Sequence, residues 1–339
     1  MSEPATQGRR RPSIYDVAER AGVSHMTVSR VLNGHPNIRE STRERVLQVI
    51  DEMNYTRSSI ARALAQGRAM RIGVLVDSPT QWGPNSTLRA LEAAAREEGY
   101  AISAFSISDD EQSQIHAGVV ELLTQGVDAL CVIAPRASSL DMLRQQSTGL
   151  PTLVIKAEPE AEMHTAALDQ RAGAMAAVMH LIELGHRSIA HLSGPLDWYD
   201  ARAREQGWRD ALADAGLPIA SPVVGDWTSD YGYTFGKSYD FARTTAVFAA
   251  NDQMALGLVH GLAERGLRVP DDVSVVGFDD LPDARHFLPP LTTVRQDFAA
   301  LGALALQILI AAIAGEEVDG HDIIEPRLVV RRSSAPPRA

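Results

Sequence analysis

The chain has 339 residues, of which 45% are hydrophobic, and this is enough to bury a sizeable core in two or three domains. A single cysteine, Cys131, excludes an internal disulfide and a cysteine-based metal site, and the apolar run at residues 129–134 predicts that it lies in a buried strand. The sequence contains no run of twenty apolar residues, and its polar start lacks the apolar stretch of a secretory signal. We therefore expect a cytoplasmic protein with no membrane partner.

The net charge of −11 is spread unevenly along the chain. Residues 1–71 contain 12 arginines and 7 acidic residues, so this part carries +5 and the remainder carries −16. Contact with the phosphates of a nucleic acid is a local electrostatic effect, and a basic segment can provide it even in an acidic protein. The distribution predicts a small polyanion-binding module attached to a larger domain with a different role.

Three short helices are predicted between residues 13 and 57. The first opens at Ser13, with Asp16 three residues later as a capping box, and ends near Gly22. The second spans residues 24–32, and the tight turn between the first two has helix-turn-helix spacing.

The third helix is predicted from about Ser41 to Met53, with Ser41 and Glu44 as a second capping pair. Its apolar stripe faces the core and consists of Val46, Leu47, Val49, Ile50 and Met53. Residues 58–66 form a helical pattern too short to be stable alone, so residues 58–70 are predicted to be a linker that orders only against a partner. We expect residues 1–12 to be a disordered basic arm.

Beyond residue 71 the pattern changes to apolar strands that alternate with amphipathic helices. Strands are predicted at residues 72–76, 101–105, 129–133, 152–155, 189–192, 246–249 and 273–278. The first helix between strands is predicted at residues 87–98, and the second follows the strand at 101–105 and ends at residue 125. The alternation indicates a parallel, doubly wound α/β fold. Residues 71–332 are long for one sheet, so we predict two similar subdomains with a cleft between them. The chain should pass between them near residue 169 and again near residue 292, and residues 333–339 should form a frayed tail.

Several sequence motifs resemble those of one family of regulators. The segments IYDVA at 14–18, AGVS at 21–24, TVSRVLN at 27–33 and TRERV at 42–46 are similar to the headpiece of LacI/GalR transcriptional regulators. The segments HLSGP at 191–195, AANDQMA at 249–255, SVVGFDD at 274–280 and PLTTV at 290–294 resemble further motifs of that family, in the same order. The resemblance runs from about residue 13 to residue 332 and implies an all-α headpiece followed by a core that resembles periplasmic sugar-binding proteins.

This resemblance implies that the second helix enters the major groove of double-stranded DNA. His25, Met26, Ser29 and Arg30 would then face base edges, and Arg30 can pair with guanine. The full set of expected DNA-binding residues is Tyr15, Ser24, His25, Met26, Thr27, Ser29, Arg30, Asn33, Thr42, Tyr55 and Leu64. Leu64, in the segment that resembles the family's hinge helix, would wedge into the minor groove; a plain surface position is the alternative. Arg9, Arg10 and Arg11 either contact phosphates or belong to a solvated arm.

The resemblance also implies an effector site in the cleft. Asp77, Asp169, Arg204, Asn251 and Asp279 would form hydrogen bonds to ligand hydroxyls, and Trp227 and Phe298 would pack against the apolar faces of the ligand. Each of the polar residues has a structural alternative, because it can instead cap a helix or pair with a neighbouring charge. Ile133 replaces an asparagine that contacts sugar in the family, so the pocket need not be identical.

The expected function is that of a repressor released from a pseudo-palindromic operator by a small neutral sugar. The ligand domain is nearest to the lactose-repressor branch, which favours a galactoside-like or other plant-derived saccharide; a nucleoside, purine or phosphorylated sugar, also as corepressor, is the alternative. The C-terminal segment lacks leucine heptads, so we predict a homodimer.

An enzyme is not expected, and we expect no cofactor and no metal. Residues 236–238 read Gly-Lys-Ser as at the end of a P-loop, but Tyr231 stands where its first glycine belongs. His186 has no cysteine or acidic cluster at metal-ligand spacing, so we interpret it as a structural residue of a turn.

Overall fold

The structure is a computed structural model that describes residues 12–32, 34–53, 55, 68–107, 114–134, 136–144, 148–157, 163–316 and 323–338. The chain divides into two compact units, Met1–Ala69 and Met70–Ala339, and each is described by itself. No helix within the described ranges is long and apolar enough to cross a membrane.

The first unit contains three helices, α1 (Ile14–Ala21), α2 (His25–Leu32) and α3 (Glu40–Glu52), around a small apolar core. The predicted capping box is present: the Asp16 carboxylate accepts from the Ser13 backbone N–H at 2.6 Å, and the Ser13 hydroxyl accepts from the Asp16 N–H at 3.3 Å. Gly22 has a φ of +64°, the left-handed conformation that glycine adopts without a steric penalty, and it ends α1.

Two details of the predicted third helix are wrong. The helix begins at Glu40, and its N-cap Arg39 makes no side-chain capping bond, so Ser41 lies inside the helix and cannot cap it with Glu44. Leu47 is 48% exposed, because only the face that carries Val46 and Val49 meets the other two helices.

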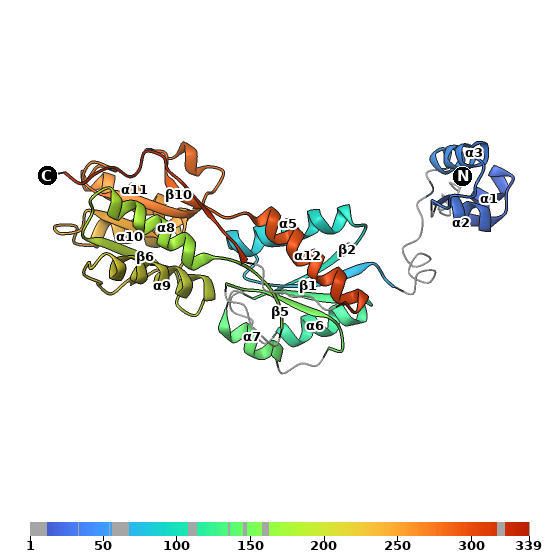
Figure 1. Cartoon of the computed structure of the whole chain (residues 1–339), viewed down its shortest axis with the longest axis horizontal. Coiled ribbons are helices and arrows are strands. Elements are labelled where there is room, and N and C mark those ends of the chain that lie inside the picture. The colour runs from blue at the N-terminus through green and yellow to red at the C-terminus, as the bar shows by residue number, and fades with distance from the viewer. Residues whose placement is uncertain are drawn as a thin grey trace, which may run out of the picture. The chain divides into compact units, whose positions relative to one another are not determined.

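The second unit contains two six-stranded sheets, each flanked by helices (Figure 1). The first sheet consists of β1 (Arg71–Asp77), β2 (Ala101–Ile107), β3 (Ala129–Ile133), β4 (Thr152–Ile155), β5 (His164–Leu168) and β11 (Ile323–Ile324), with helices α5 (Trp82–Glu97), α6 (Gln114–Thr124), α7 (Ala137–Arg144) and α12 (Phe298–Ala314). The second consists of β6 (Ile189–Ser193), β7 (Val223–Val224), β8 (Ala246–Ala249), β9 (Ser274–Asp279), β10 (Thr292–Arg295) and β12 (Arg327–Val329), with helices α8 (Gln170–Glu183), α9 (Tyr199–Asp214), α10 (Ser229–Ser238) and α11 (Asp252–Glu264) and the 3-10 turn η1 (Ala284–His286).

The two sheets have the same topology except for the direction of the last strand. The strand orders are β2-β1-β3-β4-β5-β11 and β7-β6-β8-β9-β10-β12, and all neighbours pair in parallel except β10 and β12. This confirms the predicted doubly wound fold with two similar subdomains. In such sheets, ligands bind outside the carboxyl ends of the strands.

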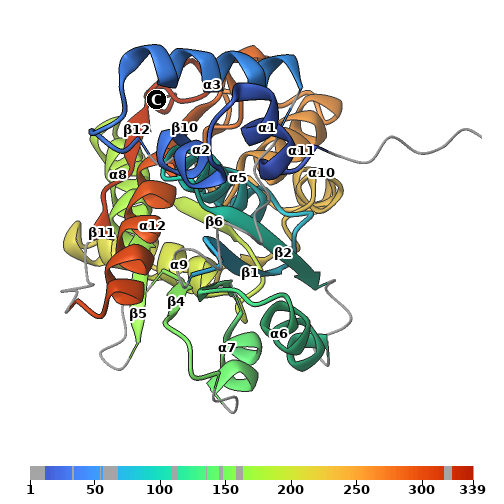
Figure 2. The same ribbon diagram turned by 90° about the vertical axis from the view of Figure 1, so that its right-hand side faces the viewer.

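Each sheet is buried on both faces, which explains the nearly continuous apolar strands. In the second sheet, Phe248 and Val276 pack against α8 and α9, whereas Val247 and Val275 pack against α10 and α11. In the first sheet, α5 and α12 cover one face and α6 and α7 lie on the other, as Figures 1 and 2 show from two directions. Cys131 is fully buried in β3 as predicted, and burial raises the pKa of its thiol to about 12.

The chain passes between the subdomains near Asp169, again between β10 and α12, and a third time between β11 and β12. Residue 292, where the second passage was expected, lies in β10 and still belongs to the second sheet, so this passage comes about four residues later.

The C-terminal segment differs from the frayed tail expected at residues 333–339. Ser333 is fully buried; its hydroxyl donates to the Val275 carbonyl at 2.6 Å and accepts from the Thr292 N–H at 2.8 Å. His186 is also buried and contacts the Ala335 carbonyl at 2.9 Å, in keeping with a structural role. The segment is held because it satisfies polar groups at the amino-terminal ends of β9 and β10.

Candidate functional site

Two adjoining pockets lie between the subdomains, at the carboxyl ends of the strands. One, which we name the tryptophan pocket, has about 320 Å³ of empty space, partly open to solvent, and is lined by Gln81, Trp82, Gly83, Pro84, Trp198, Asp200, Arg204, Trp227, Asn251 and Asp279. The other, which we name the mixed pocket, has about 440 Å³ and is lined by Gly83, Pro84, Thr87, Ile133, Ile155, Lys156, Ala157, Leu168, Gln170, Asp200, Gln296, Phe298 and Leu301. Gly83, Pro84 and Asp200 line both, so the two pockets form one continuous site.

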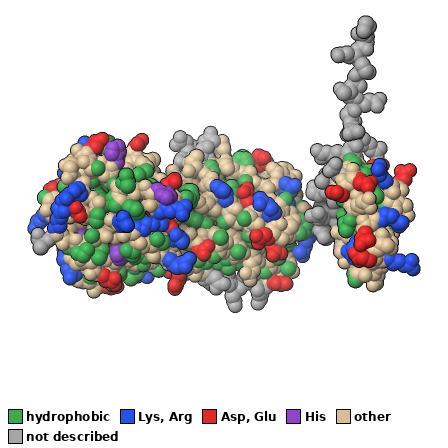
Figure 3. All heavy atoms as spheres, turned by 90° about the horizontal axis from the view of Figure 1, so that it is seen from above, with side chains coloured by type: hydrophobic (Ala, Val, Ile, Leu, Met, Phe, Trp, Pro, Cys, Tyr) green, Lys and Arg blue, Asp and Glu red, His purple; other side chains and the backbone are tan. Residues whose placement is uncertain are grey.

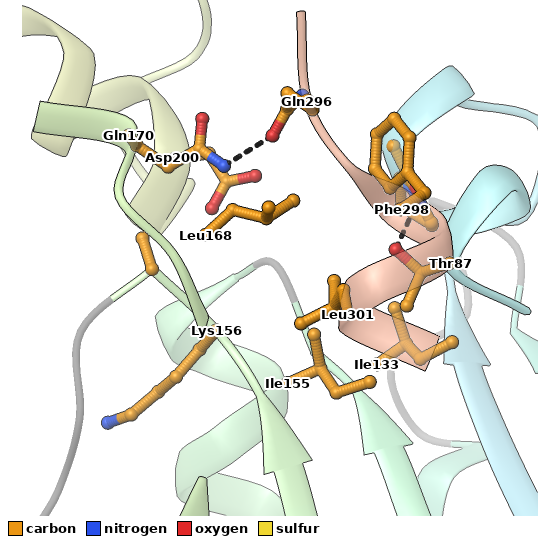
Figure 4. A pocket seen from close by; sticks show the side chains of 13 residues that line it. Thr87, Ile133, Ile155, Lys156, Leu168, Gln170, Asp200, Gln296, Phe298 and Leu301 are labelled. Atoms are coloured by element: carbon orange, nitrogen blue, oxygen red, sulfur yellow. Dashed lines mark hydrogen bonds between the residues drawn. The ribbon is translucent and has the colours of Figure 1, made fainter. Parts of the chain in front are cut away.

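The mixed pocket has a polar side and an apolar side. Figure 4 shows Gln170, Asp200 and Gln296 together on one side, and Ile133, Ile155 and Leu301 on the other. A sugar ring also combines polar edges with apolar C–H faces, so a lining of this kind matches it.

A closed ring of hydrogen bonds joins four buried side chains beside both pockets. The Arg204 Nε donates to the Gln170 Oε1 at 2.9 Å, and the Gln170 Nε2 donates to the Gln296 Oε1 at 2.7 Å. The Gln296 Nε2 donates to the Asp279 Oδ1 at 2.6 Å, which also lies 3.5 Å from the Arg204 Nη2. Each member is less than 10% exposed, so the ring fixes these groups before any ligand arrives.

Arg204 is held by further contacts. Its Nη1 donates to the Ala250 carbonyl, and its guanidinium lies 3.9 Å from the centroid of the Phe278 ring. The Asp200 carboxylate, one helical turn earlier in α9, is 3.9 Å from its Nη2. A planar guanidinium fixed in this way can orient ligand oxygens without losing further side-chain freedom.

Burial shifts the protonation of the site's carboxyl groups. It raises the pKa of Asp279 to about 6, although the charge of Arg204 acts in the opposite direction. Burial also raises the pKa of Asp200, again against Arg204, and the pKa of the fully buried Asp252 beside the site. Near neutral pH, Asp279 is therefore close to its titration point.

Five of the seven predicted effector residues line the two pockets. Arg204, Trp227, Asn251 and Asp279 line the tryptophan pocket, and Phe298 lines the mixed pocket. The Asn251 side chain caps α11 through the Met254 N–H at 2.9 Å and donates to the Trp227 carbonyl at 3.0 Å, so it also holds Trp227 in place.

Asp77 and Asp169 line neither pocket, and each has a structural partner instead. The Asp77 carboxylate is buried and accepts from the Arg136 Nε at 2.9 Å and from the Ser139 hydroxyl. Asp169 caps α8 by accepting from the Ala172 N–H at 2.8 Å. Pairing with a neighbouring charge and capping a helix were the structural alternatives left open for these residues. In the structure, Asp77 pairs with Arg136 and Asp169 caps α8.

The Asp77 ion pair also supports a contact between the subdomains. Arg136, which follows β3, forms an antiparallel bridge with Trp198, which precedes α9. Next to it, the Ala137 N–H donates to the Asp197 carbonyl at 3.2 Å. We name these paired residues, 136–137 and 197–198, the clasp.

Sequence reasoning missed several residues of the site. Trp82 and Trp198 line the tryptophan pocket, and Lys156, Gln170 and Gln296 line the mixed pocket. Gln296 lies two residues before the predicted Phe298, whereas Trp82 and Trp198 belong to no motif that we identified.

The expected DNA-facing residues of the headpiece gather at α2 and its neighbours. Tyr15 and Met26 are 65% and 56% exposed, and the Tyr15 ring lies 5.1 Å from that of His25. Arg30 is exposed, whereas Ser29 and Thr42 are partly buried. The Ser24 hydroxyl accepts from the Thr27 N–H at 3.1 Å and starts α2, and Tyr55 packs partly against the headpiece core.

Some of the expected DNA-binding residues lie outside the described residues. These are Asn33, Leu64 with the segment that resembles the hinge helix, and the basic arm with Arg9, Arg10 and Arg11.

On the face of the chain in Figure 3, basic and acidic side chains are interspersed rather than gathered into one patch of a single sign. The Lys237 of the P-loop-like segment forms an ion pair with Glu264 at 2.9 Å on the outside of α10 and α11. Among the described residues, no three His, Cys, Asp or Glu side chains are grouped as metal ligands.

The fold and the site define a DNA-binding transcriptional regulator with an effector-binding domain. Two family models match the chain: bacterial regulatory proteins of the lacI family at residues 13–58, and the periplasmic binding protein-like domain at residues 178–334. The lactose operon repressor of Escherichia coli (strain K12) is 33% identical over 96% of this chain and 91% of its own length. The repressor PurR of Vibrio parahaemolyticus is 32% identical over 95% of this chain and 98% of its own. The chain belongs to the LacI family.

Solved structures agree with this assignment. A lac repressor dimer bound to operator and the anti-inducer ONPF superposes with a TM-score of 0.84 at 32% identity, over 96% of this chain and all of that one. A complex of the transcriptional regulator CelR with cellobiose has a TM-score of 0.70 at 30% identity over the same shares.

Proposed function

We propose that this chain is a repressor that binds a pseudo-palindromic operator as a homodimer and is released when a neutral saccharide occupies the two pockets. The observation that carries the proposal is the convergence of fixed donors and acceptors from the second subdomain, opposite an apolar wall that comes mainly from the first. Arg204, Asn251, Asp279 and Asp200 supply the polar contacts, and Phe298 and Trp227 the apolar surface.

The charge of the site favours a neutral ligand. Asp200 and Asp279 both line the tryptophan pocket, and a phosphate there would face two carboxylates. The positive charge of Arg204 is already balanced by Asp279 and Asp200, which lie 3.5 Å and 3.9 Å from its Nη2. A galactoside-like or other plant-derived saccharide is therefore our first candidate, and a relative whose solved complex contains cellobiose supports the class.

A purine corepressor is the second candidate, because PurR relatives match as much of the chain as the lactose repressors do. We infer a regulator rather than an enzyme, since the relatives are regulators and the buried carboxyl groups are engaged in structural hydrogen bonds.

Ligand screening tests the ligand class. The purified chain is heated with neutral mono- and disaccharides, sugar phosphates and nucleobases, and a ligand that binds only the folded state raises the melting temperature. We expect a saccharide to do so, and Arg204→Ala to abolish the shift. Arg209→Ala is the matched control, because Arg209 lies on the same helix, pairs with Glu205 and lines neither pocket. A shift confined to phosphates or nucleobases would contradict the saccharide proposal and leave the regulator class intact.

DNA binding tests the coupling. DNA sites are selected from a random library on the full chain, and fluorescence anisotropy then measures affinity with and without the saccharide. The ligand should weaken DNA binding, and DNA should weaken ligand binding by the same factor, because the two equilibria are linked. Equal saccharide affinity in the presence and absence of operator would exclude the mechanism.

A further inference from the structure

Three of the four tryptophans in this chain line a single pocket. Trp82 is the first residue of α5 in the first subdomain, whereas Trp198 and Trp227 belong to the second. The rings of Trp198 and Trp227 pack edge to face, with centroids 5.4 Å apart. The fourth tryptophan, Trp208, lies in the core, where its indole N–H donates to the Ile189 carbonyl at 3.2 Å.

Two of the three pocket tryptophans hold a donor that the protein leaves unused. The Nε1 atoms of Trp82 and Trp227 are shielded from solvent and have no acceptor among the described residues. Trp227 is only 6% exposed. Its ring packs directly against Gly194, where an added Cβ would lie 2.2 Å from ring atoms, so the ring has no room to turn. Buried N–H groups are nearly always hydrogen-bonded in folded proteins, and two exceptions in one pocket point to a ligand.

The chemistry of these donors restricts that ligand. An indole N–H can only donate, so its partner must be an acceptor oxygen or nitrogen. The carboxylates of Asp200 and Asp279 in the same pocket can only accept when ionised, so they call for ligand donors. A hydroxyl group both accepts and donates, and a polyhydroxylated ring meets both requirements at once.

We propose that one saccharide accepts hydrogen bonds from Trp82 and Trp227 together, and that these two N–H groups determine which sugar the pocket takes. The inference rests on the proposed function and adds the specificity residues to it. Because the two donors belong to different subdomains, a ligand bonded to both connects the two halves of the site. This gives Trp227 a polar role beside its apolar contact and gives Trp82 a role that no sequence motif indicated.

Calorimetry on three single variants tests the proposal. The wild-type full chain and Trp82→Phe, Trp227→Phe and Trp198→Phe are titrated with neutral mono- and disaccharides, including lactose and cellobiose. Trp198→Phe is the matched control, because it removes similar aromatic surface from the same pocket, and the Trp198 indole N–H is not among the buried donors without an acceptor. We expect Trp82→Phe and Trp227→Phe each to bind the best saccharide about 10-fold more weakly, and Trp198→Phe to lose clearly less.

Deoxy analogues of the best saccharide separate a lost hydrogen bond from lost packing. Removing the hydroxyl that accepts from Trp82 should weaken binding to the wild type about 10-fold and weaken binding to Trp82→Phe no further. The melting temperature of Trp82→Phe without ligand checks folding, and Trp82 is the safer variant because it is only partly buried.

The results for the variants, the deoxy analogues and the wild type separate failure of the inference from failure of the proposed function. Equal losses in all three variants, or additive losses with every deoxy analogue, would overturn the inference and leave the proposed function standing. Failure of the wild type to bind any saccharide would overturn the proposed function and the inference with it.

Discussion

The side-chain amide of Gln170 donates a 2.7 Å hydrogen bond to that of Gln296, and each glutamine lies where the chain passes from one subdomain to the other. The two residues are 126 positions apart. Their bond joins two connecting segments and also belongs to the ring that contains Arg204 and Asp279. A ligand that displaces any member of this ring therefore acts directly on the connections between the subdomains.

Replacing Gln296 tests the ring. Gln296→Leu removes the donor to Asp279 and the acceptor for Gln170, and both remaining groups are buried. We expect the free energy of unfolding to fall by about 1–3 kcal/mol, measured by urea denaturation. Gln206→Leu is the control, since Gln206 is exposed on α9 and should change stability by less than about 0.5 kcal/mol. Equal effects of the two variants would show that the ring contributes nothing.

The stability of the chain should depend on pH through Asp279. Burial raises the pKa of this carboxyl from 3.8 to about 6, so the folded state binds the proton more tightly than the unfolded state. The stabilisation is complete below pH 4 and is lost as the pH rises through 6. Between pH 4 and pH 7, the unfolding free energy of the wild type relative to Asp279→Asn should fall, by at most about 3 kcal/mol. A difference that does not vary with pH would contradict the raised pKa.

Ligand affinity should show the opposite trend. The ionised Asp279 accepts hydrogen bonds from ligand hydroxyls, whereas the protonated form accepts them less well. Saccharide affinity measured by calorimetry should therefore increase between pH 5 and pH 7 in the wild type. In Asp279→Asn it should be low and nearly constant over that range.

Arg30 should contribute to base recognition. It is exposed on α2, and a bidentate contact with guanine is worth about 1–3 kcal/mol of discrimination. Arg30→Ala should reduce the preference of the chain for its selected site over random DNA by about 5-fold to 100-fold in anisotropy titrations. Arg20→Ala, which removes an exposed arginine of α1 that pairs with Glu52 of α3, should leave that preference unchanged. If both variants lose specificity alike, Arg30 acts only through its charge.

The C-terminal segment should stabilise the second subdomain. Deletion of residues 333–339 removes the buried Ser333 and the contacts of Ala335 with Ser274 and His186. We expect a loss of about 2–4 kcal/mol in unfolding free energy, from several buried hydrogen bonds of about 1 kcal/mol each. Deletion of residues 336–339 alone keeps those bonds and removes the exposed ion pairs of Arg338, so it should cost far less.

The sequence predicted strands where a short apolar run is buried on both faces of a sheet. Strands β3, β4 and β8 have the predicted bounds. Strands β5, β10 and β12 were not predicted, and neither were the edge strands β7 and β11. The last two have two residues each, and so short a segment carries no periodicity. Helix α5 begins five residues before the predicted start, because Gly83 and Pro84 resemble a turn although the first turn of a helix accepts proline.

The site was predictable where a residue lies in a motif at a strand end, as Asp279 and Asn251 do. Trp82 and Trp198 come from segments 116 positions apart that meet only in the folded chain, and no local pattern reveals that. Asp169 shows the converse: its position just before a helix was itself the signal for a cap.

The clasp gives the cleft a kinetic property. Residues 136–137 and 197–198 are joined through backbone groups, and the buried ion pair of Arg136 with Asp77 anchors one side. Opening the cleft between the subdomains must separate the two paired segments of the clasp, whichever side chains line the pockets. Ligand exchange should then wait for the clasp to release, so that association is slower than diffusion and a bound molecule has a long residence time, even where its equilibrium affinity is modest.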